Sequence, residues 1–286
     1  MTSLVSTIAC RHGLFHILDA DDTIGVSMRA YGEWSESEVR LYELLLQPGA
    51  VVVEAGANIG THTIALSRIV GASGRVHAFE PLGINHRLLC ANLLANDVFN
   101  VRTYQAALGR ELAFAAFPDV EGDRSANYGA LGFYASTDLP KLPCPLMTVD
   151  ALGLERLDFV KIDVEGHERE IVIGAMETVR RCRPVVYLET LNHHSATLAP
   201  DGHTRWSIDQ LKPEGYRFWH LITPLYNAQN WRANEHNAFP GKWSFDLVCI
   251  PEEMGRLEGL PDAETDRMHC DDPDQWRSVR FVRNHD

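Results

Sequence analysis

The chain has 286 residues, and its 39 acidic residues outnumber its 26 lysines and arginines, which gives a formal net charge of −13. A hydrophobic fraction of 45% is ordinary for a globular protein, and this length can bury a full core as one large domain or two small ones. A nucleic-acid partner is disfavoured, because proteins that bind the phosphate backbone usually present a basic face.

Residues 1–48 are expected to form an N-terminal hairpin and helix cap. The clearest element in this segment is the helix predicted by WSESEVRLYELLLQPG, which ends at its Pro-Gly pair. Ser35 takes the N-cap position and Glu38 lies three residues later, which is the spacing of a capping box. We therefore expect Ser35 and Glu38 to satisfy the first backbone N–H groups of this helix.

After residue 50, strand-like and helix-like segments alternate along the chain. Short runs rich in Val, Ile, Phe and Tyr predict strands at 50–55, 75–80, 100–106, 157–163 and 184–189. Helices are predicted between them, at 59–70, 82–95 and 166–182. This alternation is typical of βαβ units, so we expect a parallel sheet. The three valines at 51–53 show no polar alternation, as expected for a central strand covered on both faces.

Two further strands are predicted near the end of this region, at 216–222 and 244–250. The loop between them carries no convincing helix, so we expect an antiparallel pair. Residues 111–150 are strand-like in patches and are expected to form an inserted hairpin near the site. The prediction is therefore a single α/β domain over 1–286, with a core at 49–250 and a C-terminal extension at 251–286.

The stretch VVVEAGANIGTHT combines the end of a strand, two glycines and the start of a helix. Glu54 falls at the carboxyl end of the strand, which is the edge where open α/β sheets bind ligands. Gly56 and Gly60 carry no side chain, so a ligand can approach the backbone closely. The helix that begins near Ile59 adds unpaired N–H groups and the positive end of its dipole. The pattern predicts a nucleotide-type pocket, with an ordinary tight turn as the alternative.

The residues around this loop argue against a dinucleotide and against a nucleoside triphosphate. Asn58 and Thr61 stand where a dinucleotide fingerprint needs its second and third glycines, and no P-loop lysine follows. Glu80, which ends the next strand in VHAFEP, can accept both hydroxyls of a ribose. Glu54 would repel a phosphate but suits a cation. S-adenosylmethionine satisfies these requirements together, because it has an ammonium, a sulfonium and a ribose but no phosphate.

Four motifs together resemble the FkbM family of S-adenosylmethionine-dependent methyltransferases, namely VVVEAGANIGTHT, VHAFEP, ALG at 107–109 and LDFVKIDVEGHE at 157–168. The resemblance implies a Rossmann-like class I methyltransferase fold. This fold has a seven-stranded, mostly parallel sheet with an antiparallel C-terminal strand and helices on both faces. Glu54 stands where the family often has Asp, and either carboxylate would serve. The cofactor-binding residues that the resemblance implies are Glu54, Ala55, Gly56, Ala57, Asn58, Gly60, Glu80, Ala106 and Asp163.

The segment KIDVEGHERE supplies the candidate catalytic residues Asp163, Glu165 and His167. Asp163 ends the fourth strand, so we expect its carboxylate near the sulfonium end of the pocket. A hydroxyl acceptor must lose its proton as the methyl group arrives, and a carboxylate or a histidine within hydrogen-bond reach can take it. The alternative is that Glu165 and Glu168 simply favour a helix N-terminus while His167 faces solvent.

A divalent metal is the less favoured variant of this site. Asp163, Glu189 and His193 could converge on one side of the pocket, where a metal ion would acidify the acceptor hydroxyl. Their spacing matches no recognised ligand motif, so we expect no metal.

The expected activity is methyl transfer to a hydroxyl of a sugar, a glycan or a glycosylated metabolite. The loop 223–243 mixes Asn, His, Arg and aromatic side chains at the expected pocket edge, and 125–134 is a second candidate for acceptor contact. Two alternatives stay open. One is an O-methyltransferase of a polyketide- or peptide-type natural product, and the other is a non-catalytic scaffold that binds S-adenosylmethionine.

The cysteine and apolar patterns favour a cytoplasmic protein. Six cysteines are scattered without a CxxC pair, which argues against a zinc ribbon or a redox dithiol and suggests a reducing compartment. The N-terminus lacks the pattern of a signal peptide, and no run approaches the ~18 apolar residues that a bilayer crossing needs. We expect a small-molecule or glycan acceptor as the partner, and the sequence leaves a monomer and a homodimer open.

Overall fold

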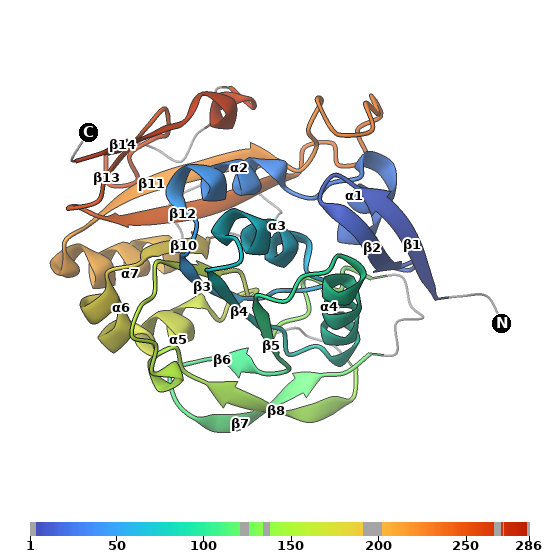
Figure 1. Cartoon of the computed structure of the whole chain (residues 1–286), viewed down its shortest axis with the longest axis horizontal. Coiled ribbons are helices and arrows are strands. Elements are labelled where there is room, and N and C mark those ends of the chain that lie inside the picture. The colour runs from blue at the N-terminus through green and yellow to red at the C-terminus, as the bar shows by residue number, and fades with distance from the viewer. Residues whose placement is uncertain are drawn as a thin grey trace.

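The computed structural model of the chain describes residues 4–120, 126–133, 138–190, 202–265, 270 and 272–284. Within them, seven strands form the central sheet, in the order β11-β12-β10-β9-β3-β4-β5 (Figure 1). These strands are β3 (Val51–Ala55), β4 (Arg75–Phe79), β5 (Val101–Tyr104), β9 (Phe159–Ile162), β10 (Val185–Glu189), β11 (Tyr216–Pro224) and β12 (Trp243–Pro251). Each of them overlaps a strand predicted from the sequence.

One strand of this sheet runs against the others. β12 is antiparallel to both of its neighbours, β10 and β11, whereas every other neighbouring pair is parallel. The predicted mostly parallel sheet with an antiparallel C-terminal strand is therefore confirmed. The direct return from β11 to β12 also confirms the antiparallel pair expected from a loop without a crossover helix.

Helices cover both faces of the sheet (Figure 1). One face carries α2 (Glu36–Leu45), α3 (Thr61–Val70) and α4 (Gly83–Ala95). The other face carries α5 (Glu168–Ile173), α6 (Met176–Cys182) and α7 (Gly202–Leu211). Val52 packs into the core under the first group and Val53 into the core under the second, which explains the run of valines in β3. Among the described helices, none has the length and apolar character that crossing a bilayer requires.

The single helix expected at 166–182 is wrong, because the chain breaks it into α5 and α6. Gly174 lies at the break, against the backbone of Gly109, and a Cβ atom there would come 2.0 Å from the Gly109 carbonyl oxygen. The two chain segments can approach this closely because Gly174 has no side chain. Helical periodicity alone does not report such a contact between distant segments.

The N-terminal segment contains a hairpin of β1 (Val5–Cys10) and β2 (Gly13–Leu18), then α1 (Ile24–Tyr31) and α2. Ser35 precedes α2 as predicted, but it adopts a left-handed conformation with φ of 45° and makes no side-chain cap. Its hydroxyl donates instead to Oε1 of Glu38, at 2.6 Å. The predicted capping box is therefore wrong, and the serine fixes the Glu38 carboxylate.

Three smaller groups of elements complete the described chain. The region 111–150, predicted as an inserted hairpin, contributes β7 (Ala113–Pro118) and β8 (Lys141–Met147), which pair with each other. β8 also pairs with β6 (Ala107–Leu108), which lies just before this region. The C-terminal segment forms the hairpin of β13 (Gly255–Glu258) and β14 (Arg280–Arg283). Short 3-10 helices lie at η1 (Asp150–Leu152), η2 (Lys212–Glu214) and η3 (Gln275–Ser278).

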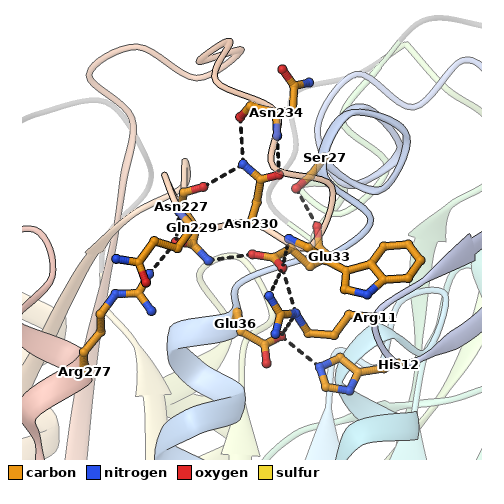
Figure 2. A network of polar contacts seen from close by, with 11 residues as sticks. Arg11, His12, Ser27, Glu33, Glu36, Asn227, Gln229, Asn230, Asn234 and Arg277 are labelled. Carbon is orange, nitrogen blue, oxygen red and sulfur yellow. Dashed lines mark hydrogen bonds and ion pairs between the residues drawn. The ribbon is translucent and has the colours of Figure 1, made fainter.

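A buried carboxylate joins three distant parts of the chain (Figure 2). Glu33, which is 4% exposed, accepts hydrogen bonds from Nε of Arg11 at 2.8 Å and from the Trp231 N–H at 2.8 Å. Its other oxygen accepts from Nδ2 of Asn227, at 2.7 Å. Asn227 in turn accepts from the Arg277 guanidinium at 2.6 Å. The N-terminal hairpin, the loop after β11 and the C-terminal segment are thereby held together.

We expect Glu33→Ala to lower the free energy of unfolding by about 2–3 kcal/mol, because several partly buried donors lose their acceptor. Urea unfolding measures this change. Glu43→Ala is the matched control, since Glu43 pairs with Arg40 at the surface and both side chains are about half exposed. That control should stay within about 0.5 kcal/mol of the parent chain. Equal effects of the two substitutions would contradict the importance of the Glu33 network.

Candidate functional site

A row of acids follows one edge of the central sheet. β3 and β10 carry Glu54 and Glu189 near their carboxyl ends, and Asp163 and Glu80 come directly after β9 and β4. Asp246, near the start of the antiparallel β12, is in register with Glu189. Because the carboxyl ends of parallel strands meet at one edge, five neighbouring strands bring their acids together there.

These acids line a cavity between the sheet edge and the helices α2 and α3, hereafter the acidic cavity. Its charged lining comprises Glu38, Glu54, Glu80, Lys161, Asp163, Glu165, Glu189 and Asp246. Side chains alternate between the two faces along each strand, and residues in register on neighbouring strands share a face. Glu54 is in register with Lys161, and Glu189 with Asp246. These side chains point toward the face that α2 and α3 cover. The cavity therefore favours a ligand that carries positive charge.

The glycine loop forms one wall of this cavity. Gly56 has φ of 84°, and a Cβ atom there would come 1.8 Å from the carbonyl oxygen of Asp163. Ala57 and Asn58 also line the acidic cavity, as predicted for cofactor-binding residues. Gly60 lines no part of it, and its left-handed φ of 91° places it as the residue that starts α3.

Glu54 is fully buried, and only one of its two carboxylate oxygens has a hydrogen-bond partner among the described residues. Thr63 donates its hydroxyl to Oε2 of Glu54 at 2.6 Å, whereas Oε1 has no hydrogen-bond partner among the described residues. Burial raises the pKa of Glu54 to about 7, although the ammonium of Lys161 opposes that rise. A buried carboxylate oxygen without a partner is costly, and the ammonium of S-adenosylmethionine would satisfy it.

Glu80 is held in a fixed orientation by two backbone groups. The Asn58 N–H donates to Oε2 and the Leu82 N–H donates to Oε1, both at 2.8 Å. Burial raises the pKa of Glu80 to about 7. A carboxylate has about four acceptor sites, so each oxygen can accept one further hydrogen bond, as the two hydroxyls of a ribose would require.

A second cavity adjoins the first and is more apolar. Gly56, Glu80, Asp163 and Glu165 line both, while Ala55, Phe79, Pro81, Ala106, Leu108, Phe133 and His167 line the second. The ring of His167 packs on Phe133, with centroids 4.6 Å apart, and burial lowers the pKa of His167. This cavity suits a flat base such as adenine. His167 therefore lies apart from Glu189 and Asp246, which line the acidic cavity alone.

Lys161 and Asp163 form an ion pair at the centre of the acidic cavity. Lys161 is 1% exposed, and its Nζ donates to Oδ2 of Asp163 at 2.7 Å. Burial raises the pKa of Asp163, but the charge of Lys161 and the hydrogen bonds with Glu189 and Lys161 together outweigh burial, and the pKa falls to about 2. Glu189 hydrogen-bonds Asp163, and burial followed by the Asp163 charge raises the pKa of Glu189 well above its usual value. Glu189 is thus the partner that holds the shared proton.

Glu165 stands beside this pair in an unusual conformation. Its φ is 56° and that of Gly166 is 97°, so the chain turns sharply after Asp163. Oε1 of Glu168 accepts from the Gly166 N–H at 2.9 Å and fixes the turn. Burial, and then the charge of Asp163, raises the pKa of Glu165 to about 8. Asp163 and Glu165 are therefore brought together as predicted, with very different proton affinities.

Sequence reasoning missed four charged or titratable residues of the acidic cavity, namely Glu38, His62, Lys161 and Asp246. Two of them left a signal, because Lys161 in DFVKID and Asp246 in SFDLVCI interrupt otherwise apolar strands. A charged residue inside a buried strand needs a partner or a ligand. Glu38 and His62 left none, since a polar residue near the start of a helix is usually solvated.

Only two of the three residues of the metal alternative can be placed, so that alternative stays a prediction. Asp163 and Glu189 are in contact through a hydrogen bond, whereas His193 lies outside the described residues. Among the described residues, no group of three or more His, Cys, Asp or Glu side chains is arranged to hold a metal ion.

The sheet order, the glycine loop and the acids at neighbouring strand ends define an α/β methyltransferase that uses S-adenosylmethionine as its methyl donor. Residues 54–218 match the family model described as the Methyltransferase FkbM domain. The chain therefore belongs to the FkbM methyltransferase family, and the resemblance seen in the sequence is confirmed.

Relatives of the chain include a synthetase and a protein named Methyltransferase 1. The chain is 30% identical over 168 residues to the AMB antimetabolite synthetase AmbE of Pseudomonas aeruginosa. This alignment covers 46% of this chain and 8% of the synthetase. The chain is also 27% identical over 144 residues to Methyltransferase 1 of Beauveria bassiana, in an alignment that covers 43% of this chain and 57% of that protein. The chain thus matches less than two thirds of either relative.

Solved structures with a similar fold include the methyltransferase FkbM of Methylobacillus flagellatus. That similarity has a TM-score of 0.46 at 18% sequence identity, and it covers 73% of this chain and 48% of the other.

We expect the affinity for S-adenosylmethionine to increase as the pH rises through about 7, because Glu54 then becomes charged. Glu54→Gln should weaken binding about 10- to 100-fold and should reduce the increase with pH. Isothermal titration calorimetry at several pH values measures both effects, with the surface variant Glu43→Gln as control. An unchanged pH dependence in Glu54→Gln would show that another group controls it.

Gly56→Ala should disrupt the glycine loop, whereas Gly71→Ala should not affect the site. Both glycines have positive φ values, so both substitutions carry backbone strain of about 1–3 kcal/mol. The difference is space, because a Cβ atom at Gly71 would meet nothing within 4 Å. We expect at least about 10-fold weaker cofactor binding in Gly56→Ala alone, measured by calorimetry, with thermal unfolding to compare stability. Equal binding by the two variants would be the contrary result.

Proposed function

We propose that this methyltransferase acts on a hydroxyl oxygen of a small, polyhydroxylated acceptor, such as a sugar or a glycosylated metabolite. The observation that carries the proposal is the polar lining of the acidic cavity beyond Glu54. Thr23, Asn127, Ser244 and Asp246 contribute hydrogen-bonding side chains there, and few apolar side chains accompany them. A sugar presents many hydroxyls that can pair with such groups.

The residues of the two cavities fit the methyl donor at both of its ends. Glu54 would bind its ammonium, Glu80 its ribose, and the second cavity, whose lining includes Phe79 and Ala106, its adenine. When bound, the donor supplies an electrophilic methyl group on a positively charged sulfur. Asp163 and Glu165, which line both cavities, would then lie where the two halves of the donor meet.

An apolar acceptor fits the cavity less well. Ile24, Trp34 and Leu225 supply the large apolar side chains of the lining. Trp34 can stack on a sugar face, as aromatic side chains do in carbohydrate sites. A polyketide of the same size would leave buried polar groups unpaired, which costs about 1–3 kcal/mol for each group. The proposal therefore ranks a sugar above a polyketide acceptor.

A panel of acceptors tests the proposal. The chain is incubated with S-adenosylmethionine and with sugars, glycosides, phenols and apolar alcohols, and S-adenosylhomocysteine is quantified by mass spectrometry. We expect methyl transfer to the sugar-bearing acceptors, with the new methyl group on oxygen. Transfer confined to phenols or apolar alcohols would overturn the sugar assignment, and transfer to nitrogen would overturn O-methylation.

A further inference from the structure

A buried histidine of the acidic cavity has a free ring nitrogen. His62, in the first turn of α3, is 4% exposed, and its Nε2 has no hydrogen-bond partner among the described residues. A buried polar atom without a partner costs about 1–3 kcal/mol. Since His62 lines the cavity in which we place the acceptor, a ligand group can supply the missing partner.

The other ring nitrogen faces a carboxylate that is itself held in place. Nδ1 of His62 lies 3.8 Å from Oε2 of Glu38, and both side chains are buried. Tyr42 donates its hydroxyl to the same Oε2 at 2.7 Å, and Ser35 donates to Oε1 at 2.6 Å. A carboxylate on this side favours the tautomer that carries its proton on Nδ1. The lone pair of Nε2 then has no hydrogen-bond partner among the described residues.

The ring is also kept uncharged and oriented. The rings of Tyr42 and His62 are perpendicular to each other, in an edge-to-face arrangement with centroids 5.7 Å apart. Burial lowers the pKa of His62, and Glu38 partly offsets that effect. The other charged or titratable groups that act on the ring are Lys161, Asp163 and His12. A neutral imidazole in this state can accept a proton near neutral pH.

We propose that His62 is the general base of the reaction, with Nε2 taking the proton of the acceptor hydroxyl, and that Glu38 is the residue that positions it. This inference rests on the proposed O-methylation. Asp163 is a poorer base, because its ion pair with Lys161 stabilises the charged carboxylate. His167 lines the second cavity instead.

The step balances in atoms and charge. The acceptor oxygen uses a lone pair to bond the methyl carbon, and the carbon–sulfur bond breaks with its electron pair left on sulfur. The hydroxyl proton passes to Nε2 of His62. One positive charge on sulfur is thereby replaced by one on the imidazole, and the carboxylates of Glu38 and Asp163 stabilise it.

The first test measures the free protein. The ¹⁵N chemical shifts of the histidine rings, assigned by their loss in His62→Gln, report the tautomer and the pKa of His62. We expect an unprotonated Nε2 near neutral pH, and a lower His62 pKa in Glu38→Gln because the stabilising carboxylate is gone. A proton on Nε2, or an unchanged His62 pKa in Glu38→Gln, would overturn the assignment of His62 as the base and Glu38 as the residue that positions it.

The second test measures catalysis with a hydroxyl acceptor. His62→Gln and His62→Asn should lower kcat about 100- to 10,000-fold and keep the parent affinity for S-adenosylmethionine, and the acidic limb of the kcat–pH profile should disappear. The exposed His236→Gln is the matched control, and Glu165→Gln tests the competing carboxylate. Full kcat in both His62 variants, or loss of cofactor binding in both, would overturn the base role. A parent chain that methylates no hydroxyl would instead overturn the proposed function itself.

Discussion

The ion pair of Lys161 and Asp163 is the interaction on which the candidate site depends. The site gathers many carboxylates in a space that water reaches poorly, and burying several like charges together is unfavourable. Lys161 lies in the middle of β9, in register with Glu54, and donates to Asp163 from a fully buried position. One lysine therefore offsets the charge of two strand ends at once, while burial raises the pKa values of Glu165, Glu189 and Asp246.

The parts of the site that are contiguous in sequence could be predicted, because their geometry follows from a strand end and a turn. Glu54, Glu80 and Asp163 each end a predicted strand, and the sheet brings them to one edge. The residues from other elements could not be predicted in this way. Glu38 and His62 belong to helices whose sequences look amphipathic, and their contact depends on how α2 packs over α3. A single sequence does not report that packing.

The prediction of the fold from a single sequence is limited in the same way, because it does not report contacts between distant segments. Every strand of the main sheet was predicted, since apolar runs between turns mark strands even without knowledge of their neighbours. The break between α5 and α6 depends on Gly109, far away in the chain, and so helical periodicity missed it. Likewise, the sequence KIDVEGHERE does not report that Asp163 and Glu165 line both cavities, whereas His167, after the sharp turn at Glu165 and Gly166, lines only the second.

The Glu33 network has a consequence for how recognition and chemistry are divided along the chain. The residues that would hold the methyl donor come from the ends of β3, β4 and β9 and the loops that follow them, whereas the loop that carries Leu225 is held by two distant segments. Arg277 donates to Asn227 of that loop directly, and Arg11 is connected to it through Glu33. Changes near Arg11 or Arg277 can therefore alter which molecules enter the cavity while the donor-binding residues stay in place.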